Sequence, residues 1–562
     1  MGTQSAALCL AATSSRGAPM SWQNENAAAL TLSYEEVPYD GLTHSETHPS
    51  LLATVGALMG MTPAPVEGCR VLEIGCAQGY NLMAMALGLP DSQFVGIDIA
   101  PGQIAAGRAA LAELGVPNVC LYALDLMDVD DSLGHFDYII AHGFFSWVPQ
   151  PVRDRLLALC RQLLTPNGIA YISYNAYPGG HFMNALRDGM LFHAGRIEAP
   201  LERAEAARGW IDLLAETGEA RTVPYSGFYK AYRQLIHDYR EHLGDEAGRS
   251  NAGLLHDELE EVNRPFYLRE FVQQVEAVGL QYLGDTEFAS MLASNLPANV
   301  AEVIQRSARS RVEAEQYLDF VRNRMFRRSL ICHQAVQLSG RPSMQTVESF
   351  WLSSNARAER VERPADSRPT WKYISPDGSS LSTDHPVTIA AFDYLGEVWP
   401  RRVAFADLMQ EAARRVGRTN RSTDQRNSQG VAANVLKAYS ISPLLIELHR
   451  HAPSLITTLS PRPVASPWAR WQVRQNSRSI CNLVHKRVLL DEPDSFLLLR
   501  LDGSRTLDEI SQELLGGPMQ EGRLFLKEKG KPGRNALPPA AQVLQAVRDR
   551  VEWFALAALL EG

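Results

Sequence analysis

Small residues follow a short apolar run early in the chain, in an arrangement that suits close approach of a ligand to the backbone. The run Val71–Ile74 contains one acid, Glu73, and Gly75, Ala77 and Gly79 follow it at every second position. Because glycine and alanine carry almost no side chain, a turn built from them exposes backbone N–H groups to a bound molecule. We therefore expect a buried strand, a cofactor-binding turn and then a helix. The alternative is an ordinary turn between a strand and a helix.

Polar side chains also end the next three apolar segments. Asp98 ends the segment 93–98, about 20 residues after the turn, a spacing that suits an acid holding a ribose diol. Asp125 ends the following segment, and His142 follows the apolar run 136–141. The carboxyl ends of parallel strands line the ligand site of an open sheet. Asp98, Asp125 and His142 should therefore converge on the glycine turn, which favours a binding site over an ordinary turn.

With these residues the chain resembles the class I methyltransferases that use S-adenosylmethionine. Glu73–Gly79 resembles their first motif, although Ala77 replaces a glycine often found there. Other segments look like methyltransferases that carry a methyltransferase regulatory domain, a group that includes lysine methyltransferases of bacterial outer-membrane proteins. These segments are SYEEVPY (33–39), THP (47–49), AHGFFSWVP (141–149), YNAYPGGH (174–181) and FVRNRMFRRSLICH (320–333).

The resemblance implies a set of residues that hold S-adenosylmethionine. Asp98 matches the family's ribose-binding acid and Asp125 its adenine-contacting acid. The motif residues are Glu73, Gly75, Ala77 and Gly79. Segments before the first strand cover the cofactor in this family, so Tyr39 is a candidate lid and substrate-binding residue. The alternative is that Tyr39 packs on the sheet.

Aromatic residues follow the fourth expected strand, at Phe144, Phe145 and Trp147. Methyl transfer from a sulfonium requires the acceptor to be aligned with the S–CH3 bond. Ring faces attract cationic groups by about 0.5–2 kcal/mol. The three rings are therefore candidates to hold a lysine side chain or to face the sulfonium, although at least one of them should belong to the core.

Three residues at strand ends are candidates for the acceptor chemistry. His142 is the strand-edge residue that can take a proton near neutral pH, although a lone histidine is more often structural. Tyr174 and Asn175 end the fifth expected strand, and their hydroxyl and carbonyl groups could orient an amine. No Cys/His cluster has the spacing of a zinc site, so we expect no metal.

Length and composition indicate a large soluble protein with several domains. The chain has 562 residues, 45% of them apolar, and a net charge of −9. An acidic chain of this kind does not suggest a nucleic-acid partner. No apolar stretch approaches the roughly 18 residues of a membrane span. The seven cysteines are scattered, which fits a reducing compartment and predicts a cytoplasmic protein.

Strand and helix patterns predict an α/β fold: a doubly wound, Rossmann-like parallel sheet with a helical insertion and C-terminal winged-helix-like modules. The expected parts are a disordered extension (1–26), a methyltransferase core (27–181), a helical insertion (182–250), the end of the core (251–290), a helical middle region (291–355), a winged-helix-like module with a linker (356–430) and a second such module (431–562). Aromatic residues of the insertion could form a homodimer or could cap their own domain. The basic run 322–328 is expected to be a solvated helix face, with an acidic or polar partner as the alternative.

The resemblance favours a protein lysine N-methyltransferase with a protein substrate, for example an outer-membrane protein. The alternatives are a methyltransferase for a small molecule or another macromolecule, a non-catalytic protein that binds an adenosyl ligand, and a nicotinamide-dependent oxidoreductase. The turn spacing disfavours the oxidoreductase, because a pyrophosphate site would favour Gly-x-Gly-x-x-Gly.

Overall fold

The structure is a computed structural model that describes most of the chain. The described residues are 36–37, 41–216, 227–234, 253–340, 342–361, 369–417, 421–456, 458–521 and 538–561. The chain divides into two compact units, Met1–Val347 with Tyr439–Pro443, and Glu348–Ala438 with Leu444–Gly562. The expected extension over residues 1–26 and the candidate lid residue Tyr39 lie outside the described residues.

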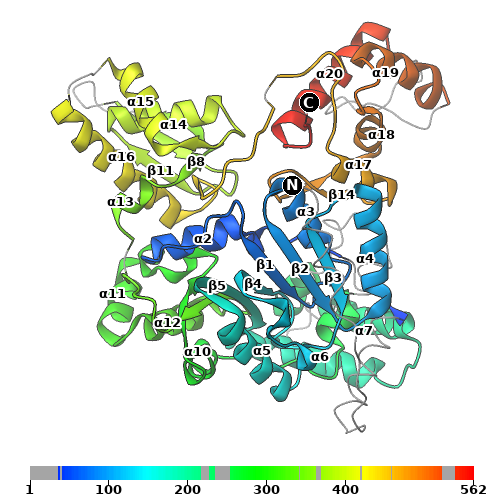
Figure 1. Ribbon diagram of the computed structural model, residues 1–562, viewed down its shortest axis with the longest axis vertical. Coiled ribbons are helices and arrows are strands. Elements are labelled where there is room, and N and C mark those ends of the chain that lie inside the picture. Colours follow the sequence, from blue (N-terminus) through cyan, green and yellow to red (C-terminus); the bar gives the residue numbers. More distant parts are fainter. Residues whose placement is uncertain are drawn as a thin grey trace. The chain divides into compact units, whose positions relative to one another are not determined.

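The first unit is built on a seven-stranded sheet with the order β3-β2-β1-β4-β5-β7-β6 (Figure 1). The strands are β1 (Arg70–Ile74), β2 (Gln93–Asp98), β3 (Val119–Ala123), β4 (Phe136–Ala141), β5 (Leu164–Asn175), β6 (Leu280–Asp285) and β7 (Phe326–His333). The first five pair in parallel, and β7 runs antiparallel to both β5 and β6. The expected doubly wound sheet is confirmed. Its order reverses between β1 and β4, and ligands of such sheets bind at this switch point.

Helices pack against both faces of this sheet. Helix α5 (Gln150–Leu163) and helix α10 (Leu268–Ala277) share one core with β4 and β5. On the opposite face, Gly56 of α2 (Pro49–Leu58) lies against the side chain of Ile169. Helix α3 (Tyr80–Gly88) packs on β2 and helix α4 (Pro101–Leu114) packs on β3.

The alternation of β5 decides which of its side chains reach the ligand edge. Ala170, Ile172 and Tyr174 belong to the core beneath α5 and α10. Because successive side chains of a strand point to opposite faces, Tyr171 and Asn175 lie on the other face, together with Ser173.

The expected helical middle region is only partly helical. Helix α11 (Ala298–Ser307) and helix α12 (Arg311–Arg322) form, but α12 ends at Asn323, whose φ is 49°. The chain then enters β7, a strand of the main sheet, so the sheet core extends to His333 instead of ending at 290.

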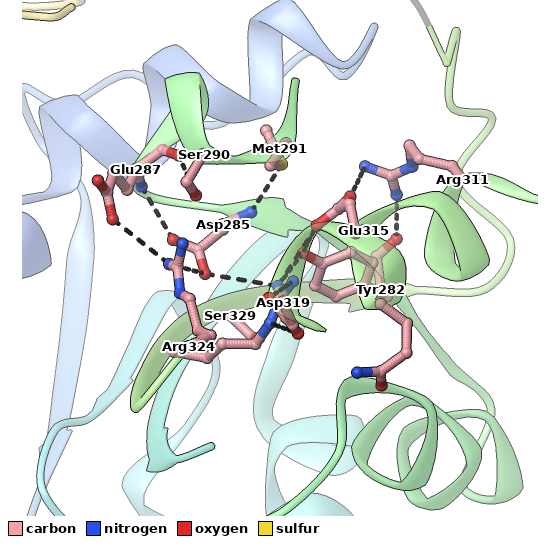
Figure 2. A network of polar contacts seen from close by, with 12 residues as sticks. Tyr282, Asp285, Glu287, Ser290, Met291, Arg311, Glu315, Asp319, Arg324 and Ser329 are labelled. Atoms are coloured by element: carbon pink, nitrogen blue, oxygen red, sulfur yellow. Dashed lines mark hydrogen bonds and ion pairs between the residues drawn. The ribbon is translucent and has the colours of Figure 1, made fainter. Parts of the chain in front are cut away.

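The basic run is not a solvated helix face, so that expectation is wrong, and the alternative of an acidic partner is confirmed. Arg327 lies on β7 and is 2% exposed. It donates to both carboxylate oxygens of Asp319 at 2.9 Å and pairs with Glu315 at 3.3 Å. Arg324 pairs with Asp285 at 3.1 Å in the same network (Figure 2). The run is therefore part of a buried ionic cluster between α12, β6 and β7.

The helical insertion begins with α6 (Gly179–Ala194) and α7 (Pro200–Glu216). Its aromatic residues Phe228, Tyr229 and Tyr232 pack into a core made with these helices and with the π-helix η6 (Leu254–Glu258). These residues therefore cap their own domain, which was the alternative to a dimer contact. The homodimer stays a prediction.

The second unit contains two modules. The first has an antiparallel sheet of β9 (Arg357–Val361), β10 (Thr370–Ile374) and β11 (Ser380–Thr383), a small sheet of β8 (Trp351–Ser353), β12 (Val403–Ala404) and β13 (Glu447–His449), and helices α14 (Pro386–Glu397), α15 (Phe405–Val416) and α16 (Arg421–Ile441). The linker was expected to extend to residue 430. This prediction is wrong from residue 421 onward, because α16 begins there.

The second module has its own apolar core. It contains α17 (Pro467–Arg474), β14 (Ser479–Cys481), β15 (Arg487–Leu489), α18 (Glu492–Arg500), α19 (Leu507–Leu514) and α20 (Ala540–Leu556). The boundary expected at 431 falls inside α16 and is therefore misplaced. Among the described residues, no helix has both the length and the apolar character that crossing a membrane requires.

Candidate functional site

The glycine turn forms as a tight loop between β1 and α3. Gly75, Ala77 and Gly79 all have left-handed backbones, with φ of 72°, 48° and 74°. This conformation costs an alanine roughly 1–2 kcal/mol more than a glycine, so the loop around Ala77 must compensate for it. A Cβ on Gly79 would lie 2.7 Å from Leu121 of β3, so this glycine also allows the turn to pack on the sheet.

Asp98 holds this turn from the end of β2. Its carboxylate accepts the backbone N–H of Ala77 at 2.8 Å and that of Ala100 at 3.0 Å. The first contact supports the strained backbone of Ala77. Asp98 therefore lies at the glycine turn, as the sequence predicts, and it also shapes the turn.

Glu73 is buried beneath the same turn. One carboxylate oxygen accepts from Asn81 Nδ2 at 2.7 Å, and the other, Oε2, is buried and has no hydrogen-bond partner. Burial raises the pKa of Glu73 to about 8, although the Asn81 contact lowers it. A cationic group of a ligand would satisfy Oε2 and favour the ionised carboxylate.

Asp125 follows β3 and caps the short helix η3 (Leu126–Asp128). Its carboxylate accepts the N–H of Met127 at 2.9 Å. Asp98 and Asp125 thus end neighbouring parallel strands, which places them at the same edge of the sheet.

His142 follows β4. It contacts β5 on the face opposite the core that packs under helix α5. Its Nδ1 lies 2.8 Å from the hydroxyl of Tyr171. Burial raises the pKa of Tyr171 well above its ordinary value, so the phenol keeps its proton. Gly143 N–H donates to Ser173 at 2.8 Å on the same strand face. The ring of His142 is therefore oriented by groups of β5.

Two residues that the sequence does not single out, His44 and Glu46, lie close to His142. The ring of His44 stacks on that of His142 with a centroid distance of 3.8 Å. His44, Glu46 and His142 present possible metal-ligand atoms within 4.8 Å of one another, although no metal was expected. Glu46 forms an ion pair with Arg328, and the imidazole rings are stacked, so the group is already organised without a cation.

The three aromatic residues after β4 do not form one cage. Phe144 lies beside the glycine turn, since a Cβ on Gly75 would be 3.0 Å from its ring. Phe145 is fully buried among Phe266 and Phe271, and Trp147 donates to the backbone carbonyl of Asp257 at 3.1 Å. The position of Phe145 does not fit a substrate contact. The ring belongs to the core, as we expected for at least one of the three.

Tyr174 and Asn175 point to different surroundings. Tyr174 is fully buried, stacks on Phe271 at 4.5 Å and shares a hydrogen bond with Ser329 at 3.0 Å. It therefore cannot orient an amine at the edge where His142 lies. Asn175 donates to Asn263 at 2.9 Å.

Asn263 in turn donates to the carbonyl of Asp257, the same carbonyl that Trp147 contacts. Burial raises the pKa of Asp257 to about 6, although His256 lowers it. Asp257 and Asn263 come from a segment far along the chain, and no spacing in the sequence connects them with Asn175.

The described residues fit the adenosyl cofactor that the sequence resemblance implies. The turn brings backbone N–H groups, the acid Asp98 and the unsatisfied oxygen of Glu73 together, and Asp125 lies at the same sheet edge. These groups suit an ammonium, a ribose diol and an adenine.

Family models match three parts of the chain. A methyltransferase domain matches residues 72–170, and a predicted methyltransferase regulatory domain matches residues 250–333. The C-terminal winged helix domain of PKMT matches residues 461–559. The last match confirms a winged helix in the final module, whereas the winged-helix character of the preceding module stays a prediction.

Two proteins of Rickettsia prowazekii are similar to this chain, one over less than half of it and one over nearly all of it. Protein RP028 of Rickettsia prowazekii is 36% identical over 245 residues, which are 44% of this chain and 94% of that protein. Protein RP789 of the same organism is 29% identical over 533 residues, 94% of this chain and 93% of that protein.

The structure of PKMT2 from Rickettsia typhi in complex with AdoHcy is 28% identical and has a TM-score of 0.78. It covers 93% of this chain and 100% of that one. AdoHcy, S-adenosylhomocysteine, is what S-adenosylmethionine becomes when it gives up its methyl group. With the sheet, the turn and these matches in agreement, the chain belongs to the S-adenosylmethionine-dependent methyltransferases that carry a methyltransferase regulatory domain.

Proposed function

We propose that this enzyme methylates lysine side chains of a protein substrate, with outer-membrane proteins as the first candidates. The observation that carries the proposal is the likeness to PKMT2, a protein lysine methyltransferase, over 93% of the chain. The winged helix match of the final module supports it, because a small substrate would not require a second unit of this size.

The proposed cofactor residues are Glu73, Gly75, Ala77, Gly79, Asp98 and Asp125. When bound, S-adenosylmethionine supplies an electrophilic methyl group on a sulfonium. Phe144 would then lie next to the reacting groups, because its ring is in contact distance of the turn at Gly75. An aromatic face attracts the sulfonium without competing for the methyl group.

The acceptor lysine must lose a proton before it can attack. With an ordinary pKa of about 10.4, only about one lysine in a thousand is neutral near pH 7.4, a cost of roughly 4 kcal/mol. His142 can accept a proton on Nε2 when its Nδ1–H donates to Tyr171, and this tautomer is available because the tyrosine oxygen can accept. Asn175 is the second polar candidate, since it faces the same side of β5 as Tyr171.

The pH dependence of methyl transfer tests the lysine assignment. With saturating cofactor, the initial rate should climb between about pH 7 and pH 9, because the neutral amine becomes more abundant. A rate that stays flat over this range, with the enzyme folded throughout, would favour a carboxylate or another acceptor that is already deprotonated.

We also propose that the enzyme works in the cytoplasm and that a homodimer forms through the helical insertion. The scattered cysteines support the first proposal. Exposed apolar side chains on α6 and α7 support the second: Phe182, Phe192, Leu201 and Leu213. Sedimentation of the parent and of Phe192→Ser would test the dimer, which should weaken in the variant.

A further inference from the structure

The segment 44–47, which we name the strap, contacts the helix that follows the glycine turn. It consists of His44 and the short helix η2 (Ser45–Thr47). The backbone N–H of His44 donates to Asn81 Oδ1 at 2.9 Å, and Asn81 Nδ2 donates to Thr47 Oγ1 at 3.0 Å. The same amide group donates to Glu73 at 2.7 Å. The strap and the buried acid of the cofactor site therefore share Asn81.

The strap also reaches the end of β4. The ring of His44 stacks on His142, and the two planes meet at 28°. Phe326, the first residue of β7, lies edge-on to His142 with a centroid distance of 6.2 Å. The strap thus joins the glycine turn to the residue we propose for proton transfer.

Arg328 of β7 pairs with the strap through Glu46. The two side chains lie 3.4 Å apart and are 35% and 23% exposed. The guanidinium also lies over the ring of Phe326, 5.7 Å from its centroid. The backbone N–H of Arg328 donates to Asp285 at 3.3 Å, and Asp285 belongs to the buried cluster of Figure 2. Arg328 therefore connects the strap to a rigid part of the sheet.

We propose that Arg328 is a positioning residue for the cofactor: through Glu46 it holds the strap against Asn81 and His142. Arg328 lies within the part of the chain that matches the methyltransferase regulatory domain, whereas the turn lies in the methyltransferase domain. This ion pair is a direct electrostatic link from that region to the strap. The proposal concerns cofactor binding alone and does not depend on the acceptor being lysine.

Neutral variants test this role in the full chain. Glu46→Gln and Arg328→Gln should each weaken AdoHcy binding about three- to tenfold in calorimetry, because a partly buried ion pair makes a modest contribution. The double variant Glu46→Arg with Arg328→Glu should recover affinity to within about twofold of the parent, because it restores the opposite charges. Added salt should weaken binding more in the parent than in the single variants.

Glu411→Gln is the matched control. Glu411 pairs with Arg415 at 2.8 Å on α15, which belongs to the second unit and not to the unit that holds the strap, so neutralising it should leave AdoHcy affinity unchanged. Parent-like affinity in both single variants would overturn the proposal, as would a folded charge-swapped variant that recovers nothing. Stabilisation of the parent by Zn²⁺, lost in Glu46→Gln, would also overturn it, because the strap residues would then be metal ligands.

Discussion

We propose that Glu73 couples cofactor binding to protonation. Its pKa of about 8 in the ligand-free protein means that the carboxyl is mostly neutral at pH 7. If the cofactor's ammonium pairs with Oε2, binding at pH 7 should release close to one proton. Calorimetry in buffers of different ionisation enthalpy measures this release, and Glu73→Gln should abolish it. Equal proton release by the parent and the variant would remove Glu73 from the cofactor site.

The raised pKa of Glu73 also determines whether the stability of the folded protein rises or falls with pH. A carboxyl whose folded pKa exceeds the usual 4.5 contributes its full stability below pH 4.5, and this contribution is lost as the pH rises through about 8. Glu73→Gln should therefore gain thermal stability relative to the parent between pH 6 and pH 9. This comparison uses the ligand-free enzyme and is independent of catalysis.

Phe144 and Phe145 should respond differently to truncation although they are neighbours in sequence. Phe145→Ala should lower the free energy of unfolding by about 3–5 kcal/mol, because it leaves a cavity in the core. Phe144→Ala should weaken AdoHcy binding or slow turnover with a smaller loss of stability, because its ring is only partly buried beside Gly75. Thermal melts and AdoHcy titrations separate the two effects. Similar losses of stability in both variants would contradict the placement of Phe144.

At the scale of single elements, the buried ionic cluster holds α12 against the sheet. Arg327→Met would leave Asp319 and Glu315 buried without their main cationic partner, a loss of about 3–5 kcal/mol. Hydrogen exchange should therefore accelerate in peptides that cover β7 and α12. Peptides of α20, in the second unit, serve as the internal control and should keep the parent's exchange rates. Unchanged protection of β7 would show that apolar packing alone fixes the strand.

The elements of the first half could be predicted because their local patterns agree with their tertiary surroundings. β1, β2 and β4 end at the expected residues, and β3 ends two residues before Asp125. Short apolar runs bounded by glycine or acids are strong signals for buried parallel strands. The candidate acids Asp98 and Asp125 follow from those strand ends.

β7 could not be predicted from local patterns because its charges are paired with acidic residues of other elements that fold against it. Adjacent arginines such as Arg327 and Arg328 suggest exposure, yet Arg327 is neutralised by Asp319 of α12. Tyr174 failed as a site residue for a simpler reason. A one-residue shift in a strand reverses the face, and the sequence did not establish which face of β5 meets the ligand edge. The strap residues His44 and Glu46 carried no motif of their own.

At the scale of the whole molecule, the second unit should serve the protein substrate. Deleting residues 458–562 should leave AdoHcy affinity intact but lower methylation of a full-length protein substrate, because the winged helix match lies in that part. Truncation at 356 is a less clean experiment, because it also removes Tyr439–Pro443, which belong to the first unit. Parent-like methylation of a full-length protein would remove a substrate-docking role for the final module.

We propose that the methyl group of S-adenosylmethionine is transferred to a lysine side chain of a protein. The direct measurement is mass spectrometry of candidate proteins, outer-membrane proteins first, after incubation with the enzyme and a deuterated methyl donor. Asp98→Asn is the matched control, because it keeps the shape of the side chain and removes its charge at the turn. We predict label on lysine side chains with the parent and little label with the control. Label on carboxylates, nucleic acid or small metabolites, with none on lysine, would contradict the lysine assignment.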